Sequence, residues 1–327
     1  MNSITFRALA EDQPGEAWRT EWTRLAEAYS AWFLREGESA RPAYGECVRA
    51  LADFMPELIP IFEQLTELAG GGDAAARLLS LWKPTPYLTA CSQVVCDKPE
   101  PSLIRNYDYS PLLFEGTIWT TNWLGTRVMG MGDCLWGMLD GVNEHGLAAS
   151  LAFGGSKVVG EGFGIPIVLR YVLQTGRDVR SAARALTKIP VHMAYNVTLC
   201  DSAGGFATVA VAPGVRARVT RDRVATNHQG AIQWREFENA TQSCGRAESL
   251  RQTLADSGGA AEKIIDAMLT PPVYAGAHSK GWGTLYTAAY RPASLAMDLY
   301  WPGRRVSRRL SDGDSWILEA SLPESIG

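Results

Sequence analysis

Apolar residues recur at helical spacing at the beginning of the chain. From residue 18 onward they lie about one turn apart, at positions 22, 25, 26, 29, 32 and 33. The predicted helices of this part are 18–35, 44–54, 57–68 and 74–81. Pro84 and Pro86 then end helix formation. The pattern therefore predicts that residues 1 to about 85 are helical.

From Tyr87 onward the pattern changes to short runs bounded by turn residues, which is typical of strands. The predicted strands are 92–96, 103–105, 117–122, 125–131, 136–142, 147–153, 195–201, 205–212, 216–225, 284–290 and 294–300. Helical spacing returns in two pairs, 166–174 with 179–188 and 246–255 with 260–268. Blocks of strands with paired helices between them indicate an α+β layered fold built on antiparallel sheets.

The composition indicates a globular protein. Of the 327 residues, 46% are hydrophobic and 20% are charged. The net charge of -4 gives no reason to expect a nucleic acid or an anionic membrane as partner. No apolar stretch approaches the roughly 18 residues of a spanning helix, and the start of the chain lacks the pattern of a signal peptide. The six cysteines follow no disulfide framework. These features predict a cytoplasmic protein with reduced cysteines.

Candidate chemistry centres on Cys91. The stretch after it reads as a strand, a turn and a returning strand that leads into Arg105-Asn106-Tyr107-Asp108. This arrangement brings a thiol, a guanidinium and a carboxylate together, and a nearby cation lowers the pKa of a thiol. Cys91 is therefore a candidate nucleophile. Arg105 and Asp108 could also form a purely structural ion pair.

The remaining polar residues give weaker signals. Cys96, Cys134, Cys200 and Cys244 are interpreted as small buried hydrophobes. The four histidines follow no zinc-ligand spacing, so neither a metal site nor a cofactor is predicted. A papain-like pairing of Cys91 with one of the histidines is disfavoured. Asp140-Gly141 and 143–146 are interpreted as turn residues rather than catalytic ones.

Several runs in order resemble one family. They are Cys91, Arg105-Asn106-Tyr107-Asp108, the stretch 140–147, the stretch 200–204, Thr226-Asn227-His228 and the stretch 283–286. They resemble the choloylglycine hydrolase and isopenicillin N acyltransferase branch of the N-terminal-nucleophile hydrolases, over about residues 40–303. The resemblance implies a four-layer αββα sandwich of two antiparallel sheets between helix layers.

The resemblance also implies a zymogen that cuts itself between Ala90 and Cys91. The products are an α segment of 1–90, retained after the cut, and a catalytic segment of 91–327, which together form one structural domain. Members of the family often have Gly before the cysteine and Thr after it, whereas Ala90 and Ser92 flank it here. Arg105 favours amide hydrolysis, because the acyltransferase proper lacks this arginine. Members often assemble into larger units, which makes a homo-oligomer an expectation.

Each residue then has an expected role. The freed α-amine of Cys91 takes the thiol proton, Asp108 holds the α-ammonium, and Arg105 favours the thiolate. Asn227 is expected to donate a hydrogen bond to the oxyanion, together with a backbone N–H within 151–155. Asn196, Phe153, Gly154 and Trp123 are expected to line the substrate pocket.

The expected reaction cleaves a linear nonpeptide amide with an apolar acyl group through a thioester. Water as acceptor makes the protein a hydrolase, and an amine acceptor or an acyl-CoA donor makes it an acyltransferase. Two alternatives stay open. One is a lipid amidase similar to acid ceramidase and N-acylethanolamine amidase. The other is an uncleaved, inactive relative that binds a small molecule, and replacing Cys91 separates this reading from the enzyme.

Overall fold

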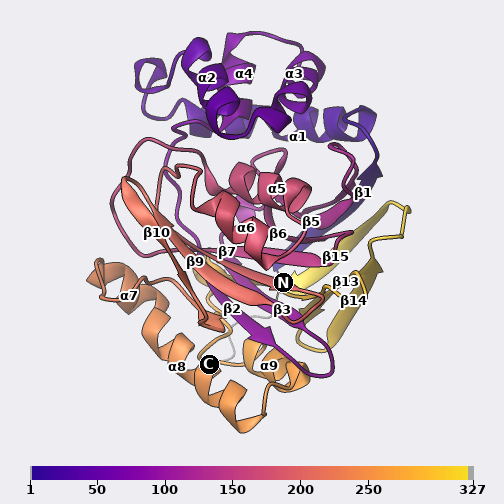
Figure 1. Ribbon diagram of the computed structural model, residues 1–327, viewed down its shortest axis with the longest axis vertical. Helices are drawn as coiled ribbons and strands as arrows, with labels where there is room; N and C mark the ends of the chain where they lie inside the picture. The colour runs from indigo at the N-terminus through magenta and orange to yellow at the C-terminus, as the bar shows by residue number, and fades with distance from the viewer. Residues whose placement is uncertain (1, 323–327) are drawn as a thin grey trace.

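The structure is a computed structural model that describes residues 2–322. Two stacked β-sheets form the centre, with helices on both outer sides (Figure 1). The larger sheet has the strand order β10 (Val215–Thr220), β9 (Phe206–Ala212), β8 (Tyr195–Asp201), β7 (Leu147–Phe153), β6 (Gly137–Asn143), β5 (Val128–Asp133), β4 (Thr117–Thr121), β1 (Asn2–Glu11) and β15 (Trp316–Leu322). The smaller sheet has the order β11 (Val224–Ala225), β2 (Ala90–Cys96), β3 (Ser102–Tyr109), β12 (Gly283–Arg291), β13 (Ala296–Trp301) and β14 (Arg304–Arg309).

The helices form layers outside the sheets. Those of the first part of the chain are α1 (Glu16–Phe33), α2 (Tyr44–Phe54), α3 (Ile59–Leu68) and α4 (Asp73–Ser80). They lie beyond α5 (Ile165–Thr175) and α6 (Val179–Leu186), which pack on the larger sheet (Figure 1). The opposite side has α7 (Arg235–Thr241), α8 (Ser243–Asp256) and α9 (Ala261–Met268), of which α8 and α9 pack on β2 and its neighbours. The predicted α+β sandwich is confirmed.

The first strand corrects the prediction of an all-helical beginning. Ile4, Phe6 and Ala8 are buried while the residues between them are more exposed, which is the two-residue period of a strand. Strand β1 pairs in antiparallel fashion with β15 and in parallel fashion with β4. The larger sheet is therefore not wholly antiparallel, and the part of the chain before Cys91 supplies one of its inner strands.

Three further differences concern the second half of the chain. The range 216–225, predicted as one strand, is divided between β10 in the larger sheet and β11 in the smaller one. Helix α7 was not predicted. The hairpin of β12 and β13 is followed by β14 and β15, which continue the two sheets.

The two faces of β2 separate two environments. Cys91 and Val95 face the main core between the sheets, whereas Val94 and Cys96 belong to a second core under α8 and α9. Because successive side chains of a strand point to opposite faces, neighbouring residues here serve different layers. Within residues 2–322, no helix is both long and apolar enough to cross a membrane.

Candidate active site

The thiol of Cys91 lies in the closed space between the two sheets. Cys91 is the second residue of β2 and has no solvent exposure. The β2–β3 register pairs Gln93 with Arg105 and Cys91 with Tyr107, so Arg105 projects from the same face two positions away. Its Nη2 donates a hydrogen bond to the Cys91 sulfur over 3.0 Å. The predicted strand–turn–strand grouping of thiol and guanidinium is present.

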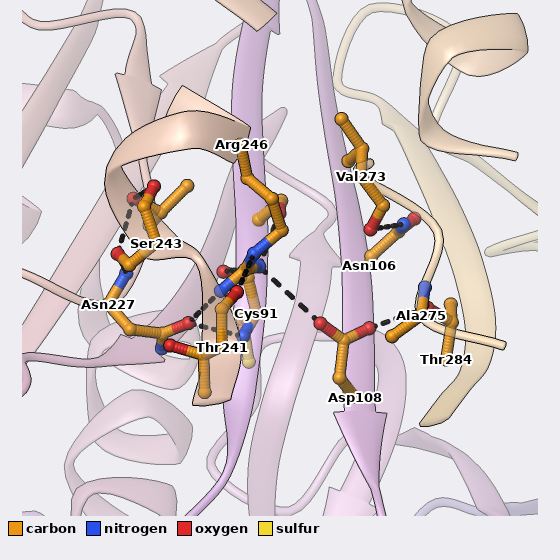
Figure 2. Close-up of polar contacts among 12 residues, drawn as sticks. Cys91, Asn106, Asp108, Asn227, Thr241, Ser243, Arg246, Val273, Ala275 and Thr284 are labelled. Atoms are coloured by element: carbon orange, nitrogen blue, oxygen red, sulfur yellow. Dashed lines mark hydrogen bonds and ion pairs between the residues drawn. The ribbon is translucent and has the colours of Figure 1, made fainter. Parts of the chain in front are cut away.

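The backbone of Cys91 is held on both sides by side chains (Figure 2). Its N–H donates to Oδ1 of Asn227 over 3.0 Å. Its carbonyl oxygen accepts a hydrogen bond from Nη1 of Arg246 over 2.9 Å. The bond between Ala90 and Cys91 is thereby fixed at its nitrogen.

Arg246 is the main residue that the sequence reasoning missed. It projects from α8, is 2% exposed, and lies between Asn227 and Asp108 in Figure 2. Its guanidinium donates to Oδ1 of Asn227 over 2.7 Å and to Oγ of Ser92 over 2.7 Å. The helix was predicted, but nothing in its sequence marks Arg246 among the other arginines near it. Only the tertiary packing of α8 on β2 brings it to the site.

Asp108 lies on the outer face of β3, opposite Ala90 in the strand register. Its two oxygens accept hydrogen bonds from Thr284 Oγ1 over 2.7 Å and from Nη1 of Arg246 over 3.4 Å. Burial raises the pKa of Asp108, although Arg246 and Thr284 act in the opposite direction. In the uncut chain Asp108 is therefore linked to Cys91 by Arg246, which contacts both residues. Its expected contact with an α-ammonium remains a prediction for the cut chain.

Asp140 corrects the reading of its stretch as turn residues. It lies within β6 with no solvent exposure, and its Oδ2 is 2.5 Å from Nη1 of Arg105. The hydroxyl groups of Tyr286 and Tyr290 also donate to its carboxylate. Asp140 therefore anchors the guanidinium that contacts Cys91. Asn143, by contrast, does bond the backbone of the following turn, as predicted.

The electrostatic setting of the thiol combines opposing effects. Burial raises the pKa of Cys91, the Arg105 guanidinium lowers it, and the Asp108 carboxylate raises it. Because burial has the largest effect, the sulfur of the uncut chain is a thiol. Arg105 stabilises the thiolate at the point where the proton leaves.

Asn227 has a different arrangement from the expected oxyanion donor. Its Oδ1 accepts from Cys91 and Arg246, while its Nδ2 donates to the carbonyl oxygen of Phe153 over 3.0 Å. The backbone N–H of Gly154, within the range expected to supply a second donor, donates to the carbonyl of Ala194 over 2.7 Å. In the uncut chain Asn227 holds the Cys91 nitrogen, while its Nδ2 bonds Phe153 and the Gly154 N–H bonds Ala194.

The four expected pocket residues have separate environments. Asn196 donates to the carbonyl oxygens of Thr226 and His228 over 2.9 and 3.0 Å, so it orients the loop that carries Asn227. The Phe153 ring packs edge-on against other rings, and Gly154 packs so closely on its neighbours that a Cβ would lie 2.9 Å from Ala194.

Trp123 lies in another part of the molecule. The guanidinium of Arg170 on α5 lies over its ring at 4.5 Å from the centroid, and the Trp119 ring is 6.0 Å away. Helix α5 packs on the larger sheet, whereas Cys91 is on the smaller one. Trp123 therefore packs on the α5 side of the larger sheet and not beside Cys91, which differs from the expected pocket position.

One group of side chains has the composition of a metal site. The ligand atoms of His228, Glu238 and Cys244 lie within 4.8 Å of one another. No ligand spacing in the sequence indicates it, because the three residues come from different segments. Contacts within the protein account for the group, since Nδ1 of His228 lies 2.8 Å from Oγ of Ser243 and the Cys244 N–H donates to Glu238. We assign no metal to it.

The fold and the cysteine site together define the class of protein. Two sheets between helix layers, with a cysteine near the start of a central strand and an arginine on its sulfur, characterise an amide-acting hydrolase or acyltransferase of the N-terminal-nucleophile class. Residues 96–306 match the family model of acyl-coenzyme A:6-aminopenicillanic acid acyl-transferase, and this is more than half of the chain. The chain therefore belongs to that family. The match begins after Cys91, so the geometry carries the assignment of the nucleophile.

One solved structure supports the fold, and two others align with lower scores. A mutant of conjugated bile acid hydrolase from Clostridium perfringens aligns with a TM-score of 0.50 and 13% identity, over 72% of this chain and 99% of that chain. Penicillin V acylase from Agrobacterium tumefaciens aligns with a TM-score of 0.44 and 13% identity, over 70% and 90% of the two chains. A Caenorhabditis elegans N-acylethanolamine-hydrolyzing acid amidase ortholog gives 0.44 and 16%, over 62% and 93%. No curated protein sequence matches the chain.

Proposed function

We propose that the chain cuts itself between Ala90 and Cys91 and then cleaves a linear nonpeptide amide through a thioester on Cys91. One observation carries the proposal: the thiol, the N–H and the carbonyl of Cys91 each contact a polar side chain of the site. A buried structural cysteine requires no such arrangement. These contacts support an attack of the Cys91 thiol on the peptide bond between Ala90 and Cys91.

The burial of the nucleophile supports the self-cleavage step. Thr89, Ala90 and Cys91 are 3%, 0% and 0% exposed, and Thr89 lies against the Cys91 sulfur. An external amide reaches this sulfur only after the residues before Cys91 have moved. A cut at Ala90 frees them to move, and it creates the α-amine that serves as base.

The proposed cut proceeds as an acyl shift followed by hydrolysis. The sulfur of Cys91 bonds to the carbonyl carbon of Ala90, the C–N bond breaks, and the nitrogen receives the thiol proton. Water then hydrolyses the thioester, which leaves a carboxylate on Ala90 and restores the thiol. Asn227 Oδ1 accepts from the nitrogen throughout, while Asp108, opposite Ala90 in the strand register, is expected to hold the new α-ammonium.

The same groups support turnover of an external amide. The α-amine, with a reference pKa of about 7.7–8.0, takes the thiol proton, and the thiolate attacks the amide carbonyl. The departing amine takes that proton when the tetrahedral intermediate collapses. Water then releases the acid from the thioester, or an amine acceptor takes the acyl group instead. Asn227 Nδ2 becomes an oxyanion donor once its bond to Phe153 is exchanged.

The intact mass of the purified protein under denaturing conditions tests the proposal. Two polypeptides, 1–90 and 91–327, are expected from the wild-type chain, together with release of free acid from octanoyl butylamide. Cys91→Ala is expected to remain one chain and to be inactive.

Cys96→Ala is the matched control. Cys96 lies on the same strand but in the second core, where burial raises its pKa to about 12. This variant is expected to be cut and active. A wild-type chain that stays whole and releases no acid contradicts the proposal and favours a binding protein.

A further inference from the structure

A second group of buried acids lies in a cavity of about 240 Å³ that is lined by Tyr109 of β3, the strand that also carries Arg105. Glu115 and Asp133, which are 4% and 7% exposed, both line this cavity. We call it the carboxyl pocket. Its aromatic wall has Tyr29 and Trp32 from α1 and Tyr87 from the segment before Cys91. These acids have no part in the mechanism above.

Shared hydrogen bonds join the two carboxyl groups. The Tyr29 hydroxyl contacts Oε1 of Glu115 and lies 3.3 Å from Oδ1 of Asp133. The Tyr87 hydroxyl donates to Oδ2 of Asp133 over 3.0 Å. Burial and the Asp133 charge raise the pKa of Glu115 to about 8, and burial also raises the pKa of Asp133. Burial and mutual repulsion therefore favour a proton shared between the two carboxyl groups.

The cation on the wall of the pocket is paired mainly with a third carboxylate. Arg24 is the basic residue among those that line it, and its guanidinium binds the Glu21 carboxylate through Nε and Nη2. The same guanidinium contacts the backbone carbonyl of Glu115 and Oγ1 of Thr117. Glu21 is thus the main partner of Arg24, although the Arg24 charge also acts on Glu115 and lowers the pKa of its carboxyl group.

Aromatic side chains connect the carboxyl pocket with the nucleophile. Tyr109, at the end of β3, lines the pocket, and its ring centroid is 5.7 Å from that of Tyr107. The Tyr107 ring lies under the guanidinium of Arg105, which contacts the Cys91 sulfur. An adjoining cavity of about 490 Å³ shares Trp32, Tyr87 and Tyr109 with the pocket and has more apolar walls. Cys91 lines neither cavity. A substrate can therefore extend from these cavities to the thiol only after the segment before Cys91 has moved, as proposed above.

The geometry points to a binding site for a primary ammonium group of the amide substrate, held by the Asp133 and Glu115 carboxylates and surrounded by tyrosine and tryptophan rings. This inference rests on the proposed amidase function. The carboxylates offer charge-assisted hydrogen bonds, and the aromatic faces add cation–π attraction. Entry of the ammonium displaces the shared proton to solvent, so uptake of one cation releases about one proton at neutral pH.

Calorimetry with butylammonium chloride tests binding without turnover. The full chain carrying Cys91→Ala is titrated at neutral pH in two buffers of different ionisation enthalpy. Saturable binding with release of about one proton is expected, and Glu115→Gln is expected to abolish the proton release. Asp133→Asn is expected to weaken binding about tenfold or more. Asp12→Asn, in an exposed ion pair with Arg127, is the control. Absence of saturable binding overturns the inference.

Matched substrates then separate the two halves of the amide. The mono-octanoyl amide of butane diamine is compared with octanoyl butylamide, and ω-aminohexanoyl butylamide with hexanoyl butylamide. An ammonium on the correct half is expected to raise kcat/KM about ten- to a hundredfold, and Asp133→Asn is expected to remove the preference. Equal rates in both pairs, with the neutral amides still hydrolysed, overturn the ammonium site and leave the amidase function intact. Failure of self-cleavage and of all four reactions contradicts the proposed function itself.

Discussion

The ion pair between Arg105 and Asp140 makes a sharp prediction about stability. Both side chains have no solvent exposure, and Nη1 of Arg105 lies 2.5 Å from Oδ2 of Asp140. Asp140→Asn keeps the shape of the side chain but leaves the Arg105 charge buried without its counterion. Removing one partner of such a buried pair costs about 3–5 kcal/mol. With a urea dependence of about 3 kcal/mol per M, the unfolding midpoint falls by about 1–1.7 M.

Urea unfolding followed by tryptophan fluorescence measures this change. All variants carry Cys91→Ala, so that self-cleavage does not alter the number of chains. Glu16→Gln is the control, because the ion pair of Glu16 with Arg19 is exposed and is expected to contribute at most about 1 kcal/mol. The double variant Arg105→Met/Asp140→Asn removes the unpaired charge. It is expected to cost less than the sum of the single variants by more than about 1 kcal/mol.

Two results refute this reasoning. If Asp140→Asn shifts the midpoint no more than Glu16→Gln does, the buried carboxylate is not the counterion that the Arg105 guanidinium requires. If the effects of Arg105→Met and Asp140→Asn add, the two side chains do not interact energetically despite their contact.

Two shorter predictions concern catalysis and pH. Arg246→Gln is expected to slow self-cleavage and amide turnover about a hundredfold, because Asn227 loses the contact that orients it, while Arg251→Gln on the exposed side of the same helix has little effect on either rate. Burial lowers the pKa of His192 to about 4 from its ordinary 6.5, so below pH 6.5 the unfolded chain binds a proton that the folded chain does not. Stability from this group is therefore complete above pH 6.5 and falls by about 3 kcal/mol as the pH drops to 4. Urea midpoints across this range are expected to depend less on pH in His192→Asn, and an unchanged slope contradicts the assignment.

The sequence predicted those parts of the site that local structure brings together. Gln93 pairs with Arg105 across a single turn, so the hairpin alone places the guanidinium beside Cys91. Asp140 lies 35 residues after its partner Arg105 in the chain, and Arg246 lies 155 residues after Cys91. Neither has a local signal, because such contacts depend on how the second sheet and α8 pack. A buried arginine is identified only once its partners are known.

The role of Asn227 shows a different limit. The motif order identified the residue, but its amide group offers both a donor and an acceptor. The structure uses the acceptor for Cys91 and gives the donor to Phe153. The strand at residues 2–11 was missed for another reason. Its alternation of buried and exposed positions is visible in the sequence, but the following helical pattern is much longer and dominated the interpretation.

The position of β1 predicts that residues 1–90 stay attached after a cut at Ala90. The strand lies inside the larger sheet between β4 and β15, and Phe6 packs against the rings of Tyr286 and Trp301 at 6.1 and 5.0 Å. Trp18 is fully buried and donates to the carbonyl of Leu135 over 3.1 Å. Burial of one such side chain contributes about 1.5–3 kcal/mol, and loss of β1 also leaves two inner strand edges unpaired.

Native mass spectrometry of the cut protein is expected to show both segments in one species, with a mass of 35.6 kDa plus the added water for each copy of the chain, whereas denaturing conditions separate two polypeptides. Because sheet pairing and apolar packing hold the segments together, molar salt is expected to leave the native species whole. The uncut Cys91→Ala chain is the reference for the mass of the native species. Release of 1–90 from a segment 91–327 that remains folded and active contradicts the prediction. That outcome also argues against the carboxyl pocket, because Tyr29 and Tyr87 leave with the released segment.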